Sequence, residues 1–330
     1  MMRLFSLPFN KVPFEEYKKL LDRYDKECIH SIYLSIPEID EHLYEEKEDD
    51  VSKELLQNTL DYKRMVVYNH GMYPYDDKEL LNHLEKAIFP LIEKYRIDGF
   101  IVTNVHVSRF LRENFPNLEL HLSCNNPVYT VRQAMNWIEN GKVDLINPPR
   151  EIGRTPTLLE EFHRHGIKQK VLLNNACAYG CSNQLNHTCS CGLEYDNNMF
   201  SCTYGEFTKW LKNCVVLPRW MKTLDDYVFV YKIAGRFLPS DVLQRMCDSY
   251  ILGRPATYMS EIASGGTLSS MYQLGYDIPL SLIPDKLSWC ECRDCETCHL
   301  CDRVLEKLHR LYKERSRSLT NDILHCNIRS

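Results

Sequence analysis

The sequence predicts an α/β protein whose main domain is a (β/α)8 barrel of the TIM type, followed by a cysteine-rich C-terminal extension. Short apolar runs typical of strands recur eight times, amphipathic stretches lie between many of them, and polar residues follow most of the runs. Eight parallel strands are the number that closes such a barrel. The alternative is an open, doubly wound sheet, but no glycine-rich phosphate loop follows the first run, which favours the barrel.

The strand-like runs cover residues 4–9, 31–36, 64–68, 99–103, 118–122, 143–146, 169–173 and 227–233. Amphipathic stretches with the spacing of helices cover residues 14–24, 77–95, 128–139 and 157–164. These units define a barrel domain over residues 1–285, which a cysteine-rich insertion interrupts at residues 177–214. Residues 286–330 form a cysteine-rich tail, in which residues 303–313 have the pattern of an amphipathic helix that packs on the barrel.

The composition is that of a globular protein without a membrane span. Of the 330 residues, 44% are hydrophobic and 26% are charged, and no apolar run approaches the ~20 residues that cross a bilayer. The net charge of −5 gives no support for nucleic-acid binding. The first residues run into strand-like sequence without a signal-peptide pattern, so we expect a cytoplasmic protein. In a reducing compartment, its 15 cysteines indicate metal binding rather than disulfides.

Positively charged side chains lie at the ends of two expected strands. Arg150 follows the sixth run, and Lys232 and Arg236 lie at the end of the eighth. The carboxyl ends of barrel strands meet at one mouth, where the active sites of this fold lie. Two guanidinium groups and an ammonium group at that mouth suit an anionic small molecule. The alternative is that Arg150 pairs with Glu151 in a purely structural role.

One group of cysteines lies in the insertion, with His187 among them. The group consists of Cys177, Cys181, Cys189, Cys191, Cys202 and Cys214. Thiolates at this density bind a soft metal or an iron–sulfur cluster. We expect the first four to ligate a 4Fe-4S cluster, with either of the last two as a substitute. Zinc in a four-thiolate site is the alternative, because the spacing does not choose between the two.

A second group of cysteines opens the tail. It consists of Cys290, Cys292, Cys295, Cys298 and Cys301. The last four are separated by two residues each, which is close to the spacing in ferredoxins. We expect a second metal or cluster site here, with zinc again as the alternative. Our hypothesis is that a second cluster passes electrons to the first.

Four short elements occur in order along the chain. They are Leu-Ser-Cys-Asn-Asn at residues 122–126, Pro-Arg-Glu at 149–151, Asn-Ala-Cys-x3-Cys at 175–181 followed by His187, and Lys-Ile-Ala-Gly-Arg at 232–236. Together they resemble peptidase family U32, the collagenase-like peptidases, over roughly residues 95–256. Ala234 departs from the family's Lys-Ile-Glu-Gly-Arg signature, so any role of that carboxylate is lost here. The C-terminal part of common members is not apparent, and the second cysteine group stands in its place.

The resemblance implies an iron–sulfur protein, because the family includes iron–sulfur members that act in the hydroxylation of RNA and of ubiquinone. It also implies prephenate as the anionic small molecule, and family members that work in pairs make a homologous partner subunit an expectation. The implied catalytic residues are Arg150, Glu151, Lys232, Arg236 and His187, with Asn125 and Asn175 lining the mouth. We therefore expect a redox enzyme with one or two 4Fe-4S clusters. A U32-type peptidase or hydrolase and a non-catalytic iron–sulfur partner are the alternatives.

Overall fold

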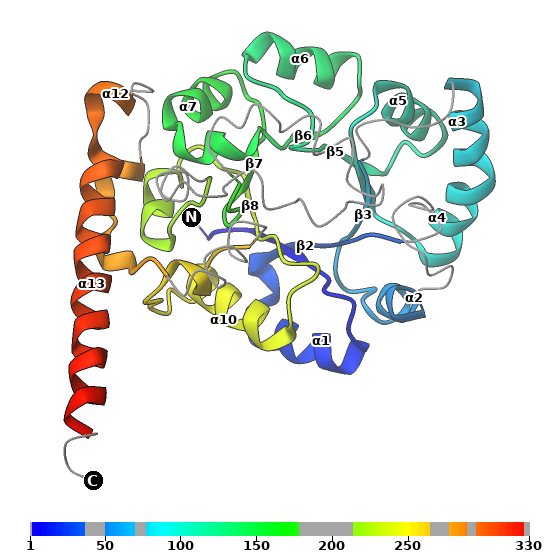
Figure 1. Ribbon diagram of the computed structural model, residues 1–330. Coiled ribbons are helices and arrows are strands. Elements are labelled where there is room, and N and C mark those ends of the chain that lie inside the picture. The colour runs from blue at the N-terminus through cyan, green and yellow to red at the C-terminus, as the bar shows by residue number, and fades with distance from the viewer. Residues whose placement is uncertain are drawn as a thin grey trace.

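The computed structural model describes residues 2–36, 50–69, 77–177, 214–264, 277–288 and 295–326. Within them, eight parallel strands form one sheet that helices surround (Figure 1). The strands are β1 (Phe5–Pro8), β2 (Ile29–Leu34), β3 (Arg64–Tyr68), β4 (Gly99–Val102), β5 (Glu119–Leu122), β6 (Leu145–Ile146), β7 (Lys170–Leu172) and β8 (Val230–Lys232). The α-helices are α1 (Phe14–Leu21), α2 (Asp50–Asn58), α3 (Asp77–His83), α4 (Phe89–Tyr95), α5 (Val105–Asn114), α6 (Val131–Glu139), α7 (Pro156–Arg164), α10 (Ser240–Ile251), α12 (Cys295–Cys298) and α13 (Leu300–Cys326).

The sheet closes almost completely into a barrel. Hydrogen-bonded neighbours follow the order β6-β5-β4-β3-β2-β1-β8-β7. Between β6 and β7, the described residues form a single parallel bridge that joins Ile146 to Gln169, and the Ile146 amide donates a 3.0 Å hydrogen bond to the carbonyl oxygen of Lys168. The predicted eight-stranded barrel is confirmed: seven of the eight strand-like runs contain one strand, and the run at 31–36 overlaps β2, which begins two residues earlier.

Local sequence explains how several helices begin and end. The Asn104 side chain, directly after β4, accepts hydrogen bonds from two backbone amides in the first turn of α5. Thr130 and Gln133 form a capping box at the start of α6. The helix expected at residues 77–95 appears as α3 and α4 joined by one π-helical turn, and it ends at Arg96, whose φ of 51° is left-handed.

The interior of the barrel differs between its two walls. A hydrophobic cluster of Tyr33, Met65, Val67 and Ile101 fills the side of β2, β3 and β4, separate from the larger core between strands and helices. The other wall contains buried polar side chains at inward positions. These are Ser6, Ser31, His121, Lys170 and Lys232. Since barrels of this type usually pack branched apolar residues inside, a polar wall suggests a chemical role.

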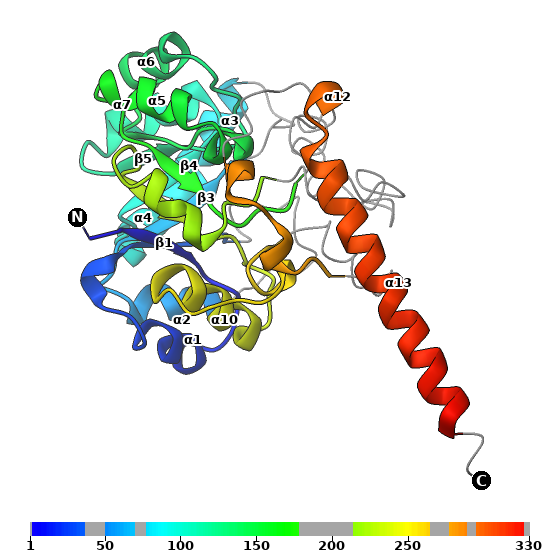
Figure 2. The same cartoon turned by 90° about the vertical axis from the view of Figure 1, so that its left-hand side faces the viewer.

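The tail packs on the barrel through the first turns of α13, as expected. Cys301, Val304 and Leu308 are buried, and the Tyr312 hydroxyl accepts a 2.8 Å hydrogen bond from the amide of Asp277. Figure 2 shows α13 continuing from this contact well past the body of the barrel. The helix is longer than the expected 303–313: it begins at Leu300 and ends at Cys326.

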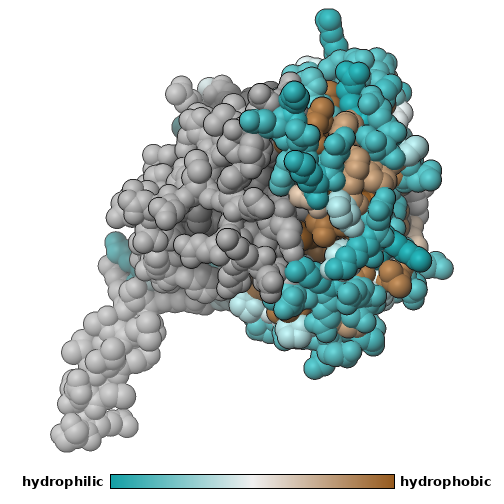
Figure 3. All heavy atoms as spheres, turned by 90° about the vertical axis from the view of Figure 1, so that its right-hand side faces the viewer, coloured by the Kyte–Doolittle hydropathy of each residue, from teal (hydrophilic) through white to brown (hydrophobic). Residues whose placement is uncertain are grey.

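The described surface is largely polar where the helices cover it. Figure 3 shows the side of the barrel that carries α2 to α5, with hydrophilic residues over most of the coloured surface and hydrophobic residues in smaller areas between them. No helix in the described part of the chain combines the length and the hydropathy that a bilayer span requires.

Candidate functional site

The mouth of the barrel, defined here as the carboxyl ends of its strands and the residues that follow them, holds a polar network around Arg150. This residue begins a 3-10 helix (Arg150–Arg154) after β6, and its Nη2 donates a 2.8 Å hydrogen bond to Oδ1 of Asn125. Asn125 is held in turn, because its backbone amide donates to the Ser123 hydroxyl at 3.2 Å. Asn69 donates to the same hydroxyl at 2.9 Å. The ends of β3, β5 and β6 thus meet at Arg150, as the sequence predicts.

Lys232 brings a buried amine to the same mouth. It ends β8, and only 8% of its surface is exposed. Its Nζ lies 4.2 Å from the centroid of the Tyr33 ring, which places the ammonium group over an aromatic face. Burial lowers the pKa of Lys232 to about 8, and the positive charges of Arg236 and Arg150 act in the same direction. These charges identify a cationic mouth to which β6 and β8 both contribute.

Arg236 is directed by the turn that follows β8. Gly235 has a φ of +150°, and a Cβ atom at this position would lie 3.0 Å from side-chain atoms of Leu238 and Leu243. Glycine therefore fits this turn best. Beyond the turn, Nη1 of Arg236 donates a hydrogen bond to the Ser35 hydroxyl after β2. The Lys-Ile-Ala-Gly-Arg segment thus positions two cations at the mouth, although its acidic position is alanine.

Cys177 and Cys214, at opposite ends of the predicted insertion, lie next to each other. The amide of Cys214 donates a 2.9 Å hydrogen bond to the carbonyl oxygen of Cys177. The Asn175 side chain accepts a 2.9 Å hydrogen bond from the Cys177 amide, so it shapes this turn. Burial raises the pKa of the Cys214 thiol well above its usual range, and the neighbouring Cys177 and Glu151 add to this effect. Two thiols therefore lie beside the Arg150 segment.

Two buried polar side chains near β6 have unsatisfied atoms. Oε1 of Glu151 accepts a 2.6 Å hydrogen bond from the Tyr129 hydroxyl, whereas its Oε2 has no hydrogen-bond partner among the described residues. The same holds for both side-chain polar atoms of Asn147, which is 1% exposed. Buried polar atoms are seldom left unpaired, so these atoms point to a ligand or ordered water. Asn147 was missed in the sequence, although it directly follows the sixth strand.

Several predicted site residues lie outside the described part of the chain. They are Cys181, His187, Cys189, Cys191, Cys202, Cys290 and Cys292. Cys298, at the end of α12, is half-buried, and Cys301, in the first turn of α13, is buried. Both thiols lie near the contact between the tail and the barrel. Among the described residues, no group of three or more His, Cys, Asp or Glu side chains has an arrangement that could hold a metal ion.

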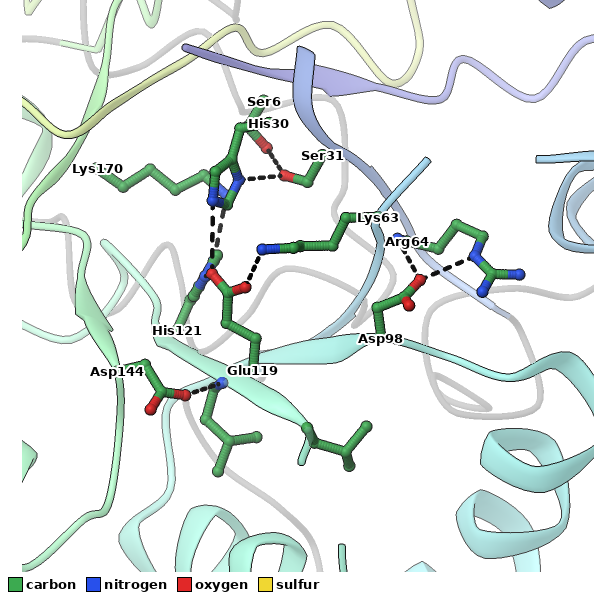
Figure 4. Close-up of polar contacts among 12 residues, drawn as sticks. Ser6, His30, Ser31, Lys63, Arg64, Asp98, Glu119, His121, Asp144 and Lys170 are labelled. Atoms are coloured by element: carbon green, nitrogen blue, oxygen red, sulfur yellow. Dashed lines mark hydrogen bonds and ion pairs between the residues drawn. The ribbon is translucent and has the colours of Figure 1, made fainter. Parts of the chain in front are cut away.

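A second polar group, the base cluster, lies at the amino ends of β2, β3, β5 and β7, opposite the mouth, and Figure 4 shows its contacts. It consists of His30, Lys63, Glu119, His121 and Lys170. Lys170 Nζ lies 3.2 Å from His121 Nδ1, and His121 Nε2 lies 2.5 Å from Oε1 of Glu119. His30 Nε2 lies 3.6 Å from the same oxygen, and Lys63 pairs with the other carboxylate oxygen. A continuous series of polar contacts therefore leads from the buried Lys170 to the amino ends of the strands.

Burial sets the protonation states of the base cluster. Burial and the charge of Lys170 lower the pKa values of His30 and His121 to about 3, so both rings are neutral at physiological pH. Burial would raise the pKa of Glu119, but its hydrogen bonds with His121 and Lys63 hold this pKa well below its usual range. Burial also lowers the pKa of Lys170 well below that of a free lysine, and repulsion from Lys232 adds to the effect.

Ser31 adjoins the base cluster and contacts His30, which faces Glu119, so the three residues are arranged as in a hydrolase triad. His30 Nδ1 lies 3.2 Å from the Ser31 hydroxyl, and its Nε2 faces Glu119. However, Ser31 is fully buried in the barrel and shares its hydroxyl with Ser6 at 2.8 Å. Because no substrate bond can reach it there, Ser31 is not a nucleophile. A cavity of about 370 Å³ lies outside the cluster and is lined in part by His30, Glu119 and Phe229.

Comparison with known proteins agrees with the fold. Residues 18–157 match the model of peptidase family U32. The chain is 22% identical over 234 residues to "Uncharacterized protease MJ1657" of Methanocaldococcus jannaschii, an alignment that covers 67% of this chain and 69% of that protein. It is also similar to the solved structure of the U32 peptidase Mk0906, with a TM-score of 0.53 and 13% identity, over 72% of this chain and 95% of that one.

The matched segment contains part of the site described above. It includes Asn125, Arg150 and Glu151, and it ends before Cys177 and Lys232. The structural similarity concerns the barrel fold, since its sequence identity is low. The family match covers two of the four short elements, at residues 122–126 and 149–151, and ends before the other two. Over residues 18–157 the chain is therefore similar to peptidase family U32.

Proposed function

We propose that the mouth of the barrel binds an anionic small molecule beside a cysteine-ligated 4Fe-4S cluster, and that the protein is a redox enzyme. The observation that carries this proposal is the hydrogen bond between the backbones of Cys177 and Cys214, next to the segment that begins at Arg150. It gathers two soft ligands and a carboxylate-binding side chain at one place. The anion in this proposal is prephenate.

The residues at the mouth fit the proposed anion. Arg150 presents a planar fork of donors whose direction its bond to Asn125 fixes. Lys232 and Arg236 add positive charge from the other side of the mouth. The unsatisfied Oε2 of Glu151 and the Asn147 amide offer polar contacts to the uncharged part of such a molecule. These residues would bind and orient the anion.

The cysteines fit a cluster by their chemistry. Cys177 and Cys214 would supply two thiolates, and the further ligands would come from Cys181, Cys189, Cys191 or Cys202. When bound, the cluster would supply one-electron transfer at the mouth. A second cluster held by the tail cysteines, among them Cys298 and Cys301, would relay electrons to it. A homologous partner subunit and the hydroxylation of a larger acceptor are further parts of this proposal.

A peptidase is the second candidate, because the curated relative carries the name protease. Hydrolysis requires an activated nucleophile or a metal-bound water. In the described residues the serine–histidine pair at Ser31 is buried, so a peptidase reaction would depend on zinc at the cysteine group with an open coordination position. The identity of the metal thus separates the two candidates.

The test is anaerobic purification of the full chain, followed by iron, sulfide and zinc analysis of one sample. We expect about four or eight irons with equal sulfide per chain and a broad brown absorbance. Zinc without iron, together with cleavage of an unfolded substrate such as casein, would replace the redox proposal by the peptidase.

A further inference from the structure

Two lysine side chains lie inside the barrel on adjacent strands. Lys170 on β7 is in register with Val230 on β8, and Lys232 follows Val230 by two residues, so both lysines point inward. Lys170 is fully buried, and Lys232 is 8% exposed. Burying an ammonium group is costly, and two such groups repel each other. This cost points to a chemical use for at least one of the two amines.

The amine of Lys232 is placed and prepared for nucleophilic attack. It lies at the mouth, and none of the described residues forms an ion pair with it. Burial of the side chain, together with the positive charges of Arg236 and Arg150, lowers its pKa to about 8, so a larger share of this amine is unprotonated near neutral pH than of a free lysine. A lysine that is desolvated beside other cations is the usual form of an amine nucleophile that attacks carbonyl groups.

We propose that the amine of Lys232 condenses with the ketone of a 2-oxo acid to form a Schiff base. The inference rests on the proposed anion site, because Arg150 or Arg236 would hold the carboxylate while the adjacent ketone faces the amine. The side chain of prephenate contains such a ketone next to a carboxylate. The proposal therefore names the substrate class of the mouth and gives Lys232 a covalent role.

The reaction needs no external oxidant or reductant. The lone pair of Nζ attacks the ketone carbon, and the ketone oxygen takes up a proton to give a hydroxyl group. That proton is one of the two that the neutral amine loses; the hydroxyl then leaves as water with the second one, and a carbon–nitrogen double bond forms. Water reverses the same steps. A proton taken up from water converts the imine into an iminium ion, which withdraws electrons and makes the neighbouring carbon–hydrogen bonds acidic.

The test uses pyruvate with the purified full-length protein. Borohydride reduces a Schiff base to a stable secondary amine, which peptide mass spectrometry locates. We expect a pyruvate adduct on Lys232, and deuterium incorporation into the methyl group of pyruvate in heavy water. Lys232→Met and Lys232→Arg should abolish both signals while circular dichroism stays unchanged. Lys94→Met, at an exposed lysine on the outer helix α4, is the matched control and should change neither.

The outcomes separate this inference from the proposed function. An adduct that is spread over surface lysines, or found on Lys170, would overturn the inference. Saturable binding of pyruvate or prephenate without modification of Lys232 would also overturn it, and would leave the anion site standing. Absence of both binding and modification would reject the anion site as well.

Discussion

The backbone hydrogen bond between Cys177 and Cys214 joins the two ends of the cysteine-rich insertion at the mouth of the barrel. The Asn175 side chain holds the turn at Cys177 from within the same strand end. Both thiols are therefore fixed by ordered backbone on either side of the segment that contains the remaining cysteines. This arrangement would give the proposed metal site two ligands that lie in the described part of the chain.

The first prediction concerns these anchors. Cys177→Ser and Cys214→Ser should each lower the iron content per chain and the visible absorbance of anaerobically purified protein, because a hydroxyl group is a poor ligand for a soft cluster. Cys247→Ala is the matched control, since Cys247 is a buried thiol on α10 far from the insertion in sequence. Iron at the wild-type level in both serine variants would remove these residues from the ligand set.

Arg150 and Arg154 lie in one 3-10 helix but should differ in their effect on stability. Arg154 is 1% exposed and donates from Nε and Nη2 to the carbonyl oxygen of Leu287, at 3.1 and 2.7 Å. Arg154→Met leaves that carbonyl unpaired and should lower the free energy of unfolding by about 2–4 kcal/mol. Arg150→Met should lower it by less than about 1 kcal/mol. Urea titration measures both, and equal losses would assign Arg150 a structural role.

Lys232→Met should make the fold more stable. The pKa of Lys232 falls from 10.5 to about 8 on burial, which means that the folded protein holds the charged form at a cost near neutral pH. Removing the amine should raise the free energy of unfolding by about 1–3 kcal/mol at pH 7. Thermal and urea unfolding test this expectation. A destabilised variant would show that the contact with Tyr33 outweighs the cost of burial.

The histidines of the base cluster should make the fold sensitive to acid. The pKa values of His30 and His121 are about 3 in the folded protein and 6.5 in the unfolded chain, so the unfolded chain binds more protons between these values. Stability should therefore fall as the pH drops below about 6.5. His30→Gln should flatten this decline, whereas His163→Gln, at an exposed histidine on α7, should not. Urea titrations of both variants and the wild type from pH 7 to pH 4 measure the free energy of unfolding at each pH. A decline with falling pH that is as steep in His30→Gln as in the wild type would contradict the account.

The strands could be predicted because each lies in or overlaps a short apolar run, and a polar residue follows most of these runs. The base cluster could not, for a reason visible in β5. There Glu119-Leu120-His121-Leu122 alternates polar and apolar residues, which is the pattern of a strand with one face in water. In the barrel, the polar face points inward and meets Lys170. Only closure of the sheet brings these side chains together.

The residues at the mouth were easier to predict from the sequence. Arg150 follows β6 and Lys232 ends β8, so the topology of a parallel barrel places both at the carboxyl ends of the strands. Asn175 shows the limit of that reasoning. Its position after β7 predicted a residue that lines the mouth, but an asparagine there can also stabilise a turn, and its side chain accepts a hydrogen bond from the Cys177 amide. Asn147 stands one residue after β6, and only its buried, unsatisfied amide distinguishes it from an ordinary strand-ending asparagine.

Calorimetric titration with prephenate tests most directly whether the mouth is an anion site. We expect saturable binding of one molecule per chain to the wild type, and at least about ten-fold weaker binding to Arg150→Ala, because the guanidinium fork is lost. Arg154→Ala, if folded under the same conditions, should bind as the wild type does. Absence of saturable binding to the wild type, or equal affinity in Arg150→Ala, would contradict the account.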